Sequence, residues 1–143
     1  MQIAIIIATE PEVKPLGLGG DLETNLKMVT KLGYDGVELT VGQPNRLAID
    51  NIKKLIKRYG LSVPAIGTGL TYTVYGLSFT SSDKGMRERA VERVKEYLKL
   101  GKELNSPIII GSIKGRAQNH FRGMENLKNC LRECAEFAEE SGC

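Results

Sequence analysis

Four short apolar runs alternate along the chain with longer stretches in which apolar residues recur every three or four positions. The runs are rich in Ile and Val, and two of them are nearly continuous, which is typical of parallel strands buried on both faces. The longer stretches have the spacing of amphipathic helices. One such run alone would also suit a buried helix, but four in succession favour strands. The expected strands span 3–8, 36–41, 61–67 and 107–110, and the expected helices span about 21–33, 47–60, 83–104 and 123–141.

The junctions from helix to strand also share a repeated sequence pattern. Each expected helix ends near a Gly or Asn that can adopt the left-handed conformation of a helix C-cap, and a strand follows after one or two residues. By the same rule Cys143, directly after Gly142, would open a fifth strand. The pattern is a (βα)4 repeat with right-handed crossovers. The connections over 9–20 and 68–82 exceed the roughly 2–6 residues usual after a strand, and long loops at the carboxyl ends of strands commonly line a site.

Two architectures of the α/β class accommodate four βα units: a small open doubly wound sheet, or half of a TIM (βα)8 barrel. The repeat pitch is about 35 residues, so eight units would need about 280, close to the length of a complete barrel. The chain has 143 residues, of which 41% are hydrophobic and 26% charged. This composition fits a single globular unit over residues 1–143 and excludes a disordered or fibrous chain.

Charge and hydropathy exclude several classes of partner. The chain carries 20 Lys and Arg against 17 Asp and Glu, a formal net charge of +3, without a block of like charges, so no nucleic-acid-binding tail is expected. No run approaches the roughly 18 consecutive apolar residues of a membrane span. The first residues lack the basic region and cleavage site of a secretory leader. The expectation is a cytoplasmic protein with neither a nucleic acid nor a membrane as partner.

Several segments, taken in order, match the strand signatures of a known superfamily. They are Leu-Gly-Tyr-Asp-Gly-Val-Glu-Leu at 32–39, Gly-Leu-Ser-Val-Pro-Ala-Ile-Gly-Thr-Gly at 60–69, the helical stretch 87–104 with Ser-Pro-Ile-Ile-Ile-Gly at 106–111, and the pair Gly115-Arg116. Together they resemble the first half of the xylose isomerase-like superfamily. That superfamily holds sugar-phosphate isomerases, ketose 3-epimerases and endonuclease IV-like proteins, and the chain looks most like its tagatose 3-epimerase-related members.

The resemblance implies a TIM barrel of which this chain supplies the first four units. It implies isomerisation or epimerisation of a small sugar, by proton abstraction from a carbon next to a carbonyl. In the family a divalent metal, Mn, Mg, Co or Zn, is held by two Glu, an Asp and a His in the second half of the barrel. The first of these ligands belongs to a Glu-Pro-Leu-Asn-like motif on strand five, and the sequence ends at Cys143 before that motif. No catalytic residue or metal ligand is therefore assigned here.

Polar residues and glycines at the ends of the expected strands are the candidates for the substrate pocket. They are Glu38, Gly67, Thr68, Gly69, Gly111, Ser112 and Arg116. Glu38 can hydrogen-bond a sugar hydroxyl, or it can order a loop instead. The turns at 67–69 and 111–112 let a ligand approach the backbone closely, although turn geometry alone explains them equally well. Arg116 suits a clamp for phosphate or carboxylate, or a solvated basic loop.

Other features favour structural interpretations. His120 is the only histidine and is expected in a solvent-facing loop. Cys130 and Cys134, four positions apart on one expected helix, indicate small buried thiols rather than metal ligands. The glycine-rich segment 16–20 imitates a dinucleotide-binding fingerprint, but it lies well beyond the first strand instead of in a tight turn. The aromatic residues in the loop over 68–82 either stack on a sugar ring or pack the loop itself.

The expectation is the first half of a metal-dependent isomerase or epimerase acting on a sugar or sugar phosphate, with little activity on its own. A half barrel leaves strand edges and an inner face uncovered, so either a homo-oligomer or the remainder of the barrel is expected as partner. One alternative is a non-catalytic half-barrel module that acts in assembly. A less favoured alternative is an endonuclease IV-like DNA repair protein, which would need a basic groove and a His-rich metal cluster.

Overall fold

The computed structural model describes residues 1–10, 17–117 and 119–143, and these residues form a four-stranded parallel sheet. Each strand pairs with the next one in the chain. The strands are β1 (Ala4–Ala8), β2 (Gly36–Thr40), β3 (Ile66–Gly67) and β4 (Ile108–Ile109). The expected parallel α/β sheet is confirmed. The consecutive order is that of a barrel, because an open doubly wound sheet reverses its strand order.

Helix caps explain where the long helices begin and end. The long helices are α1 (Leu22–Lys31), α2 (Ile49–Tyr59), α4 (Lys84–Leu104) and α5 (His120–Ser141). The caps Asp21, Asp83 and Asn119 each accept a hydrogen bond from a backbone N–H three residues later. Because Asn119 provides such a cap, α5 begins three residues before the expected start. Gly60, Asn105 and Gly142 follow α2, α4 and α5 in the left-handed conformation.

The third strand is shorter than the sequence predicts, because its first part is bulged away from β2. Ser62 pairs with Gly36. Four residues later Ile66 pairs with Leu39, only three residues beyond Gly36. One residue is therefore extra on the side of β3, as in a β-bulge. Pro64 lies in this segment and has no N–H to donate to a neighbouring strand.

Three short helical turns lie where the sequence predicts loops. They are η1 (Pro44–Arg46), α3 (Gly69–Thr73) and η2 (Ser112–Lys114). The hydroxyls of Thr71 and Tyr97 lie 2.7 Å apart and tie α3 to α4. The backbone N–H of Phe79 donates to the carbonyl of Ile113 at 3.0 Å, so the chain after β3 is joined to the chain after β4. These turns are too short to carry a detectable period.

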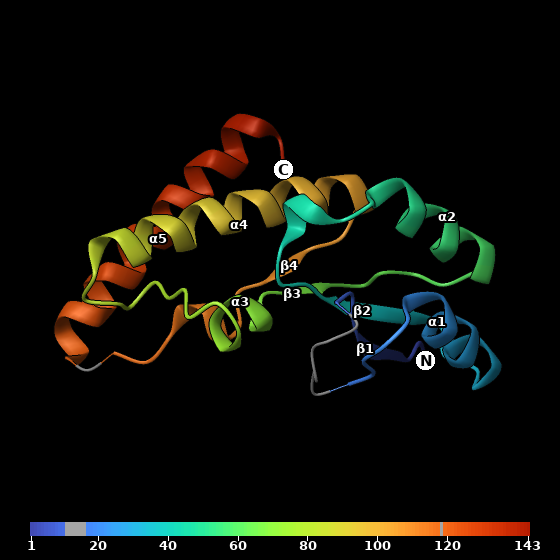
Figure 1. The fold of residues 1–143 in the computed structure, drawn as a ribbon. Helices are drawn as coiled ribbons and strands as arrows, with labels where there is room; N and C mark the ends of the chain where they lie inside the picture. Colours follow the sequence, from blue (N-terminus) through green and yellow to red (C-terminus); the bar gives the residue numbers. More distant parts are fainter. Residues whose placement is uncertain (11–16, 118) are drawn as a thin grey trace.

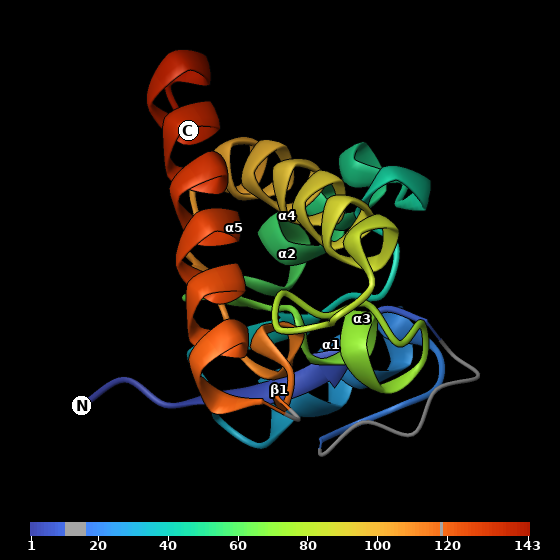
Figure 2. The same cartoon turned by 90° about the vertical axis from the view of Figure 1, so that its left-hand side faces the viewer.

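The buried apolar side chains form two clusters. The first lies between the sheet and helices α1, α2 and α4 and includes Ile7, Val37, Leu39, Ile66, Leu26 and Tyr97. The second includes residues of α4 and α5 and of the loops beside them: Val91, Val94, Cys130, Cys134, Phe79 and Ile113. Helices α4 and α5 run side by side (Figure 1 and Figure 2). The predicted burial of Cys130 and Cys134 is confirmed, and burial raises the pKa of the Cys134 thiol to about 12.

Candidate functional site

Glu38, Thr40 and Gly67 meet on one face near the carboxyl ends of β2 and β3. A Cβ atom at Gly67 would lie 3.2 Å from Glu38 Oε1 and 3.3 Å from Thr40 Oγ1. Alternation along β2 sends Val37 and Leu39 to the opposite face, into the core. Glu38 is half-buried, and none of the described residues donates a hydrogen bond to its carboxylate. The glycine leaves space beside a carboxylate that retains its capacity to accept hydrogen bonds from a ligand.

Thr68 is fully engaged in joining β3 to the chain after β4. Its buried hydroxyl donates to the carbonyl of Ile109 at 3.0 Å and accepts from the N–H of Gly111 at 3.2 Å. Gly69 is the first residue of α3 and Ser112 the first residue of η2. This arrangement supports the turn-geometry interpretation of both segments, while Ser112 keeps an exposed side chain.

Arg116 lines a cavity that does not include Glu38. The Arg116 side chain is exposed, and the cavity, which lies between the loop after β3 and the start of α5, is also lined by Arg87 and Arg122. The structure therefore divides the sequence candidates into two groups. One group includes Glu38 and Gly67 on a shared face of β2 and β3, and the other includes Arg116 in the loop after η2.

A polar network that the sequence analysis did not identify lies beyond β1 and β2. Glu10 Oε1 accepts hydrogen bonds from the N–H groups of Gly42, at 2.7 Å, and Gln43, at 3.1 Å. Gln43 Nε2 donates to the Tyr75 hydroxyl at 2.7 Å. The Arg93 guanidinium lies 5.3 Å from the centre of the Tyr75 ring and donates to the carbonyl of Gly42. The glycine at position 42, two residues after β2, is the feature of the sequence that points to this close packing, because a Cβ there would press against Tyr75 and Glu10.

Tyr97 of α4 holds the segment before Gly42 in place from the core side. Its side chain is fully buried, and its hydroxyl donates to the carbonyl of Val41 and contacts the Thr71 hydroxyl. Burial raises the pKa of Tyr97 far above its ordinary value, so the phenol stays neutral. A neutral buried phenol with two hydrogen-bond partners has a structural role. Because one partner is Thr71, this contact agrees with the interpretation of the connection over 68–82 as a packed loop.

Two sequence features have structural explanations. Leu16 of the glycine-rich segment lies outside the described residues. Gly17 lies so close to β1 that a Cβ would overlap the Ile6 carbonyl, and Leu18 forms a bridge with Ile7. These glycine contacts serve close backbone packing. His120 is exposed as expected, although it begins α5 instead of lying in a loop.

The described residues do not by themselves form a metal centre. Over 1–10, 17–117 and 119–143, no three His, Cys, Asp or Glu side chains come together. Glu38 faces Gly67, whereas Glu10 is already occupied by two backbone N–H groups. This set does not fit a centre with two Glu, an Asp and a His, so no reaction step through a metal is derived from these residues.

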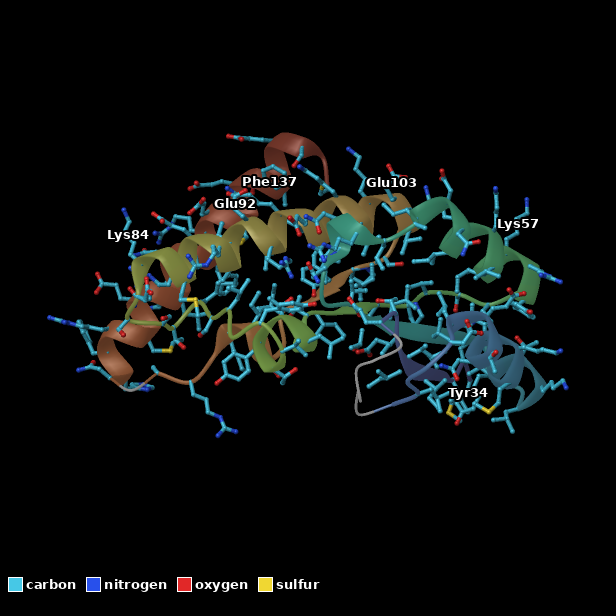
Figure 3. The ribbon with its side chains drawn as sticks, in the orientation of Figure 1. Tyr34, Lys57, Lys84, Glu92, Glu103 and Phe137 are labelled. Carbon is cyan, nitrogen blue, oxygen red and sulfur yellow. The ribbon has the colours of Figure 1, made fainter. Side chains whose placement is uncertain are left out.

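Charged side chains lie on the outer surface of the helical layer. Lys57, Lys84 and Glu103 point away from the strands (Figure 3). Among the described residues, no helix combines the length and apolar composition needed to cross a membrane.

Comparison with known proteins identifies relatives of this fold. Residues 26–143 match a family model described as "Xylose isomerase-like TIM barrel". Fructoselysine 3-epimerase of Escherichia coli O157:H7 is 28% identical over an alignment of 130 residues, and the match covers 85% of this chain and 46% of that protein. The chain therefore spans about half the length of the curated relatives it matches.

This chain also superposes on about half of each similar solved structure. The apo form of 3-keto-D-glucoside 4-epimerase from E. coli superposes with a TM-score of 0.68 at 17% identity, over 95% of this chain and 52% of that chain. D-psicose 3-epimerase from Clostridium cellulolyticum H10, solved with D-tagatose, gives a TM-score of 0.68 at 20% identity, over 99% and 50%. At these identities the likeness shows the fold: four βα units that correspond to half of a TIM barrel.

Proposed function

The chain belongs to the xylose isomerase-like TIM barrel family, and we propose that it is the substrate-pocket half of a metal-dependent sugar epimerase or isomerase. One observation carries the proposal: Glu38, in the middle of β2, has an open acceptor carboxylate on the face that it shares with Gly67 of β3, where the glycine leaves room for a ligand. The matched epimerases support the class of substrate, a small sugar with a carbonyl group.

In this proposal the chain binds and orients the sugar. The Glu38 carboxylate accepts hydrogen bonds from one or two sugar hydroxyls, and Gly67 allows the ring or chain of the sugar to approach the backbone. Orientation of this kind contributes to catalysis because it replaces an encounter of freely moving groups by a fixed geometry. The metal and the proton-transferring carboxylates belong to the complementary half of the barrel.

The proposed partner is that complementary half, or a second copy of this chain. Strand β4 pairs with β3, and the side chain of Ile109 on β4 is 43% exposed. An exposed apolar residue on a sheet edge favours pairing with another strand. The opposite edge of the sheet, formed by β1, is partly covered because Leu18 pairs with Ile7. We expect light scattering of the purified chain at micromolar concentration to give a mass above that of one chain, and a stable monomer would contradict this.

The test of activity uses deuterium exchange. Abstraction of the proton next to the carbonyl of a ketose, followed by return of a deuteron from D2O, labels that carbon and is detected by NMR. The chain alone, with Mn²⁺ and D-fructose or D-psicose, is expected to give no labelling. A fusion to strands five to eight of a related epimerase is expected to label the ketose, and Glu38→Gln in the fusion is expected to raise KM.

The matched control is Glu139→Gln on the exposed surface of α5, which is expected to leave KM unchanged. Labelling by the chain alone would contradict the half-barrel assignment. A folded fusion that binds Mn²⁺ without labelling any ketose would contradict the epimerase assignment and favour a module that acts only in assembly.

A further inference from the structure

A cavity of about 560 Å³ opens between the loop after β3 and the first turns of α5. Its lining is mainly polar: it includes the hydroxyls of Ser78 and Thr80 and the amide of Asn126. Both walls follow the carboxyl end of a strand, which is the edge of an α/β sheet where ligands bind. The position therefore suits a ligand and the lining suits a polar one.

Three arginines from three different elements line this cavity. Arg87 comes from α4, Arg116 from the loop after η2, and Arg122 from the first turn of α5. Glu125 supplies one opposing carboxylate, but no carboxylate of the described residues lies within 4.0 Å of any of the three guanidinium groups. The side chains of Arg116 and Arg122 are exposed. Their charge is thus not neutralised by the described part of the chain.

The walls of the cavity are held in place by hydrogen bonds. Arg87 Nη1 donates to the carbonyls of Ser81, at 2.8 Å, and Ser82, at 3.1 Å. Asn126 Nδ2 donates to the same Ser81 carbonyl at 3.1 Å, which links α5 to the opposite wall. The N–H of Thr80 donates to the carbonyl of Lys114 at 3.2 Å. The backbone around the cavity is therefore held by the protein itself and does not need to be ordered by the ligand, which lowers the cost of binding.

Two glycines allow close packing around the cavity. Gly115 has a φ of +79°, and a Cβ there would overlap the Ser78 hydroxyl, so this glycine lets the loop that carries Arg116 approach the opposite wall. A Cβ at Gly123 would overlap the side chain of Ala117, so the second glycine lets the same loop pack on the first turn of α5.

We propose that this cavity binds the phosphate group of a phosphorylated sugar. Guanidinium groups are planar, permanently charged and able to donate two hydrogen bonds to one phosphate, and serine and threonine hydroxyls add neutral donors. Tyr72 lines the cavity and lies on α3, four residues after Thr68, so the cavity adjoins the strand ends through α3. The anion site stands on its own geometry, whereas the identity of the attached sugar rests on the proposed function.

The test measures binding of inorganic phosphate to the chain by isothermal titration calorimetry, at low ionic strength and without a divalent metal. The double variant R116Q/R122Q removes two exposed guanidinium groups and is expected to weaken binding at least about tenfold, close to 1.4 kcal/mol. The matched control is R132Q, which removes one positive charge from the exposed surface of the same helix and is expected to leave the Kd unchanged. Absence of phosphate binding, or equal weakening by R132Q, would overturn the proposal.

Two further ligands separate the possible outcomes. D-fructose 6-phosphate is expected to bind more tightly than inorganic phosphate, and Glu38→Gln is expected to remove this difference without affecting inorganic phosphate. If Glu38→Gln has no effect while R116Q/R122Q still weakens both ligands, the anion site stands and the sugar site of the proposed function fails. Tighter binding of a short DNA duplex than of the sugar phosphate, with the same arginine dependence, would overturn the sugar phosphate in favour of nucleic acid.

Discussion

The two sides of the carboxyl edge differ in where their polar side chains find partners. Beyond β1 and β2, Glu10 accepts two backbone hydrogen bonds, and Gln43 donates to Tyr75. Beyond β3 and β4, Arg116 and Arg122 line a cavity without a carboxylate of the described residues in range. The first side is a closed network and the second is an open one.

This difference separates scaffold from binding surface. A polar group whose hydrogen-bonding capacity is already used by the protein fixes the backbone around it, and displacing its partners would cost free energy. A charged group without a protein partner keeps its capacity for a ligand. By this criterion the network around Glu10 and Tyr75 holds the strand ends in place, while Glu38, Arg116 and Arg122 are available for binding.

The largest difference in stability is expected between the loss of a tyrosine on the closed side and the loss of one on the open side. Tyr97→Ala removes a fully buried ring and its ties to Val41 and Thr71, so we expect a loss of about 3–5 kcal/mol in the free energy of unfolding. Tyr72→Ala, at the partly exposed wall of the cavity, is expected to cost less than half as much. Urea denaturation followed by circular dichroism measures both losses, and equal losses would show that the two tyrosines contribute equally to stability.

A smaller loss is expected where the open side depends on a glycine. Gly115→Ala places a side chain at a positive φ and against the Ser78 hydroxyl, which is expected to cost about 1–3 kcal/mol and to weaken phosphate binding. Gly69→Ala is the control, because nothing lies within 4 Å of its Cβ position and its φ is not positive. The same denaturation and calorimetry apply, and an unchanged Kd in Gly115→Ala would show that the cavity does not need this close approach.

Removing one charge on each side is expected to affect stability differently. Glu10→Gln weakens two charge-assisted hydrogen bonds to Gly42 and Gln43 and is expected to cost about 1 kcal/mol. Arg116→Gln removes an exposed charge without a carboxylate partner among the described residues and is expected to stay within about 0.5 kcal/mol of the parent. Denaturant midpoints distinguish the two, and the reverse order would contradict the division into scaffold and binding surface.

The smallest effect is expected on the outer surface, far from either side of the edge. Lys53 holds the pKa of Glu103 below its ordinary value of 4.5, so this ion pair stabilises the fold above pH 4.5. The contribution disappears as the pH falls through the lowered pKa of Glu103. Because both side chains are exposed, the effect is small. Thermal unfolding across this acid range is expected to show a weaker pH dependence in Glu103→Gln and in Lys53→Gln, and an unchanged dependence would remove the pair from the account.

The fold was largely predictable because its signals are local. Helical spacing and caps such as Asp21 and Asp83 act within a few residues, and apolar runs mark the strands. The bulge before Ile66 and the helix α3 were not predictable, since they depend on partners distant in the sequence, as in the contact of Thr71 with Tyr97.

The candidate site was predictable only in part for the same reason. Glu38 and Gly67 belong to strand segments that a sequence pattern can select, and the structure brings them together, although Glu38 lies in the middle of β2 and not at its end. Their role in binding stays a prediction. The cavity around Arg116 needs α4 and α5 to place two further arginines beside it, and the network around Glu10 joins residues more than thirty positions apart. No local pattern encodes either arrangement.

An NMR titration of the chain with D-fructose 6-phosphate tests directly whether Glu38 and the open side of the carboxyl edge together form the binding surface. We expect the backbone amide signals of Glu38, Gly67 and residues 115–117 and 119–123 to shift with one common affinity. The signals of Gly42 and Gln43, within the closed network, are expected to stay in place. Shifts centred on Gly42 and Gln43, or no shifts at Glu38 and around Arg116 and Arg122, would show that the ligand binds elsewhere.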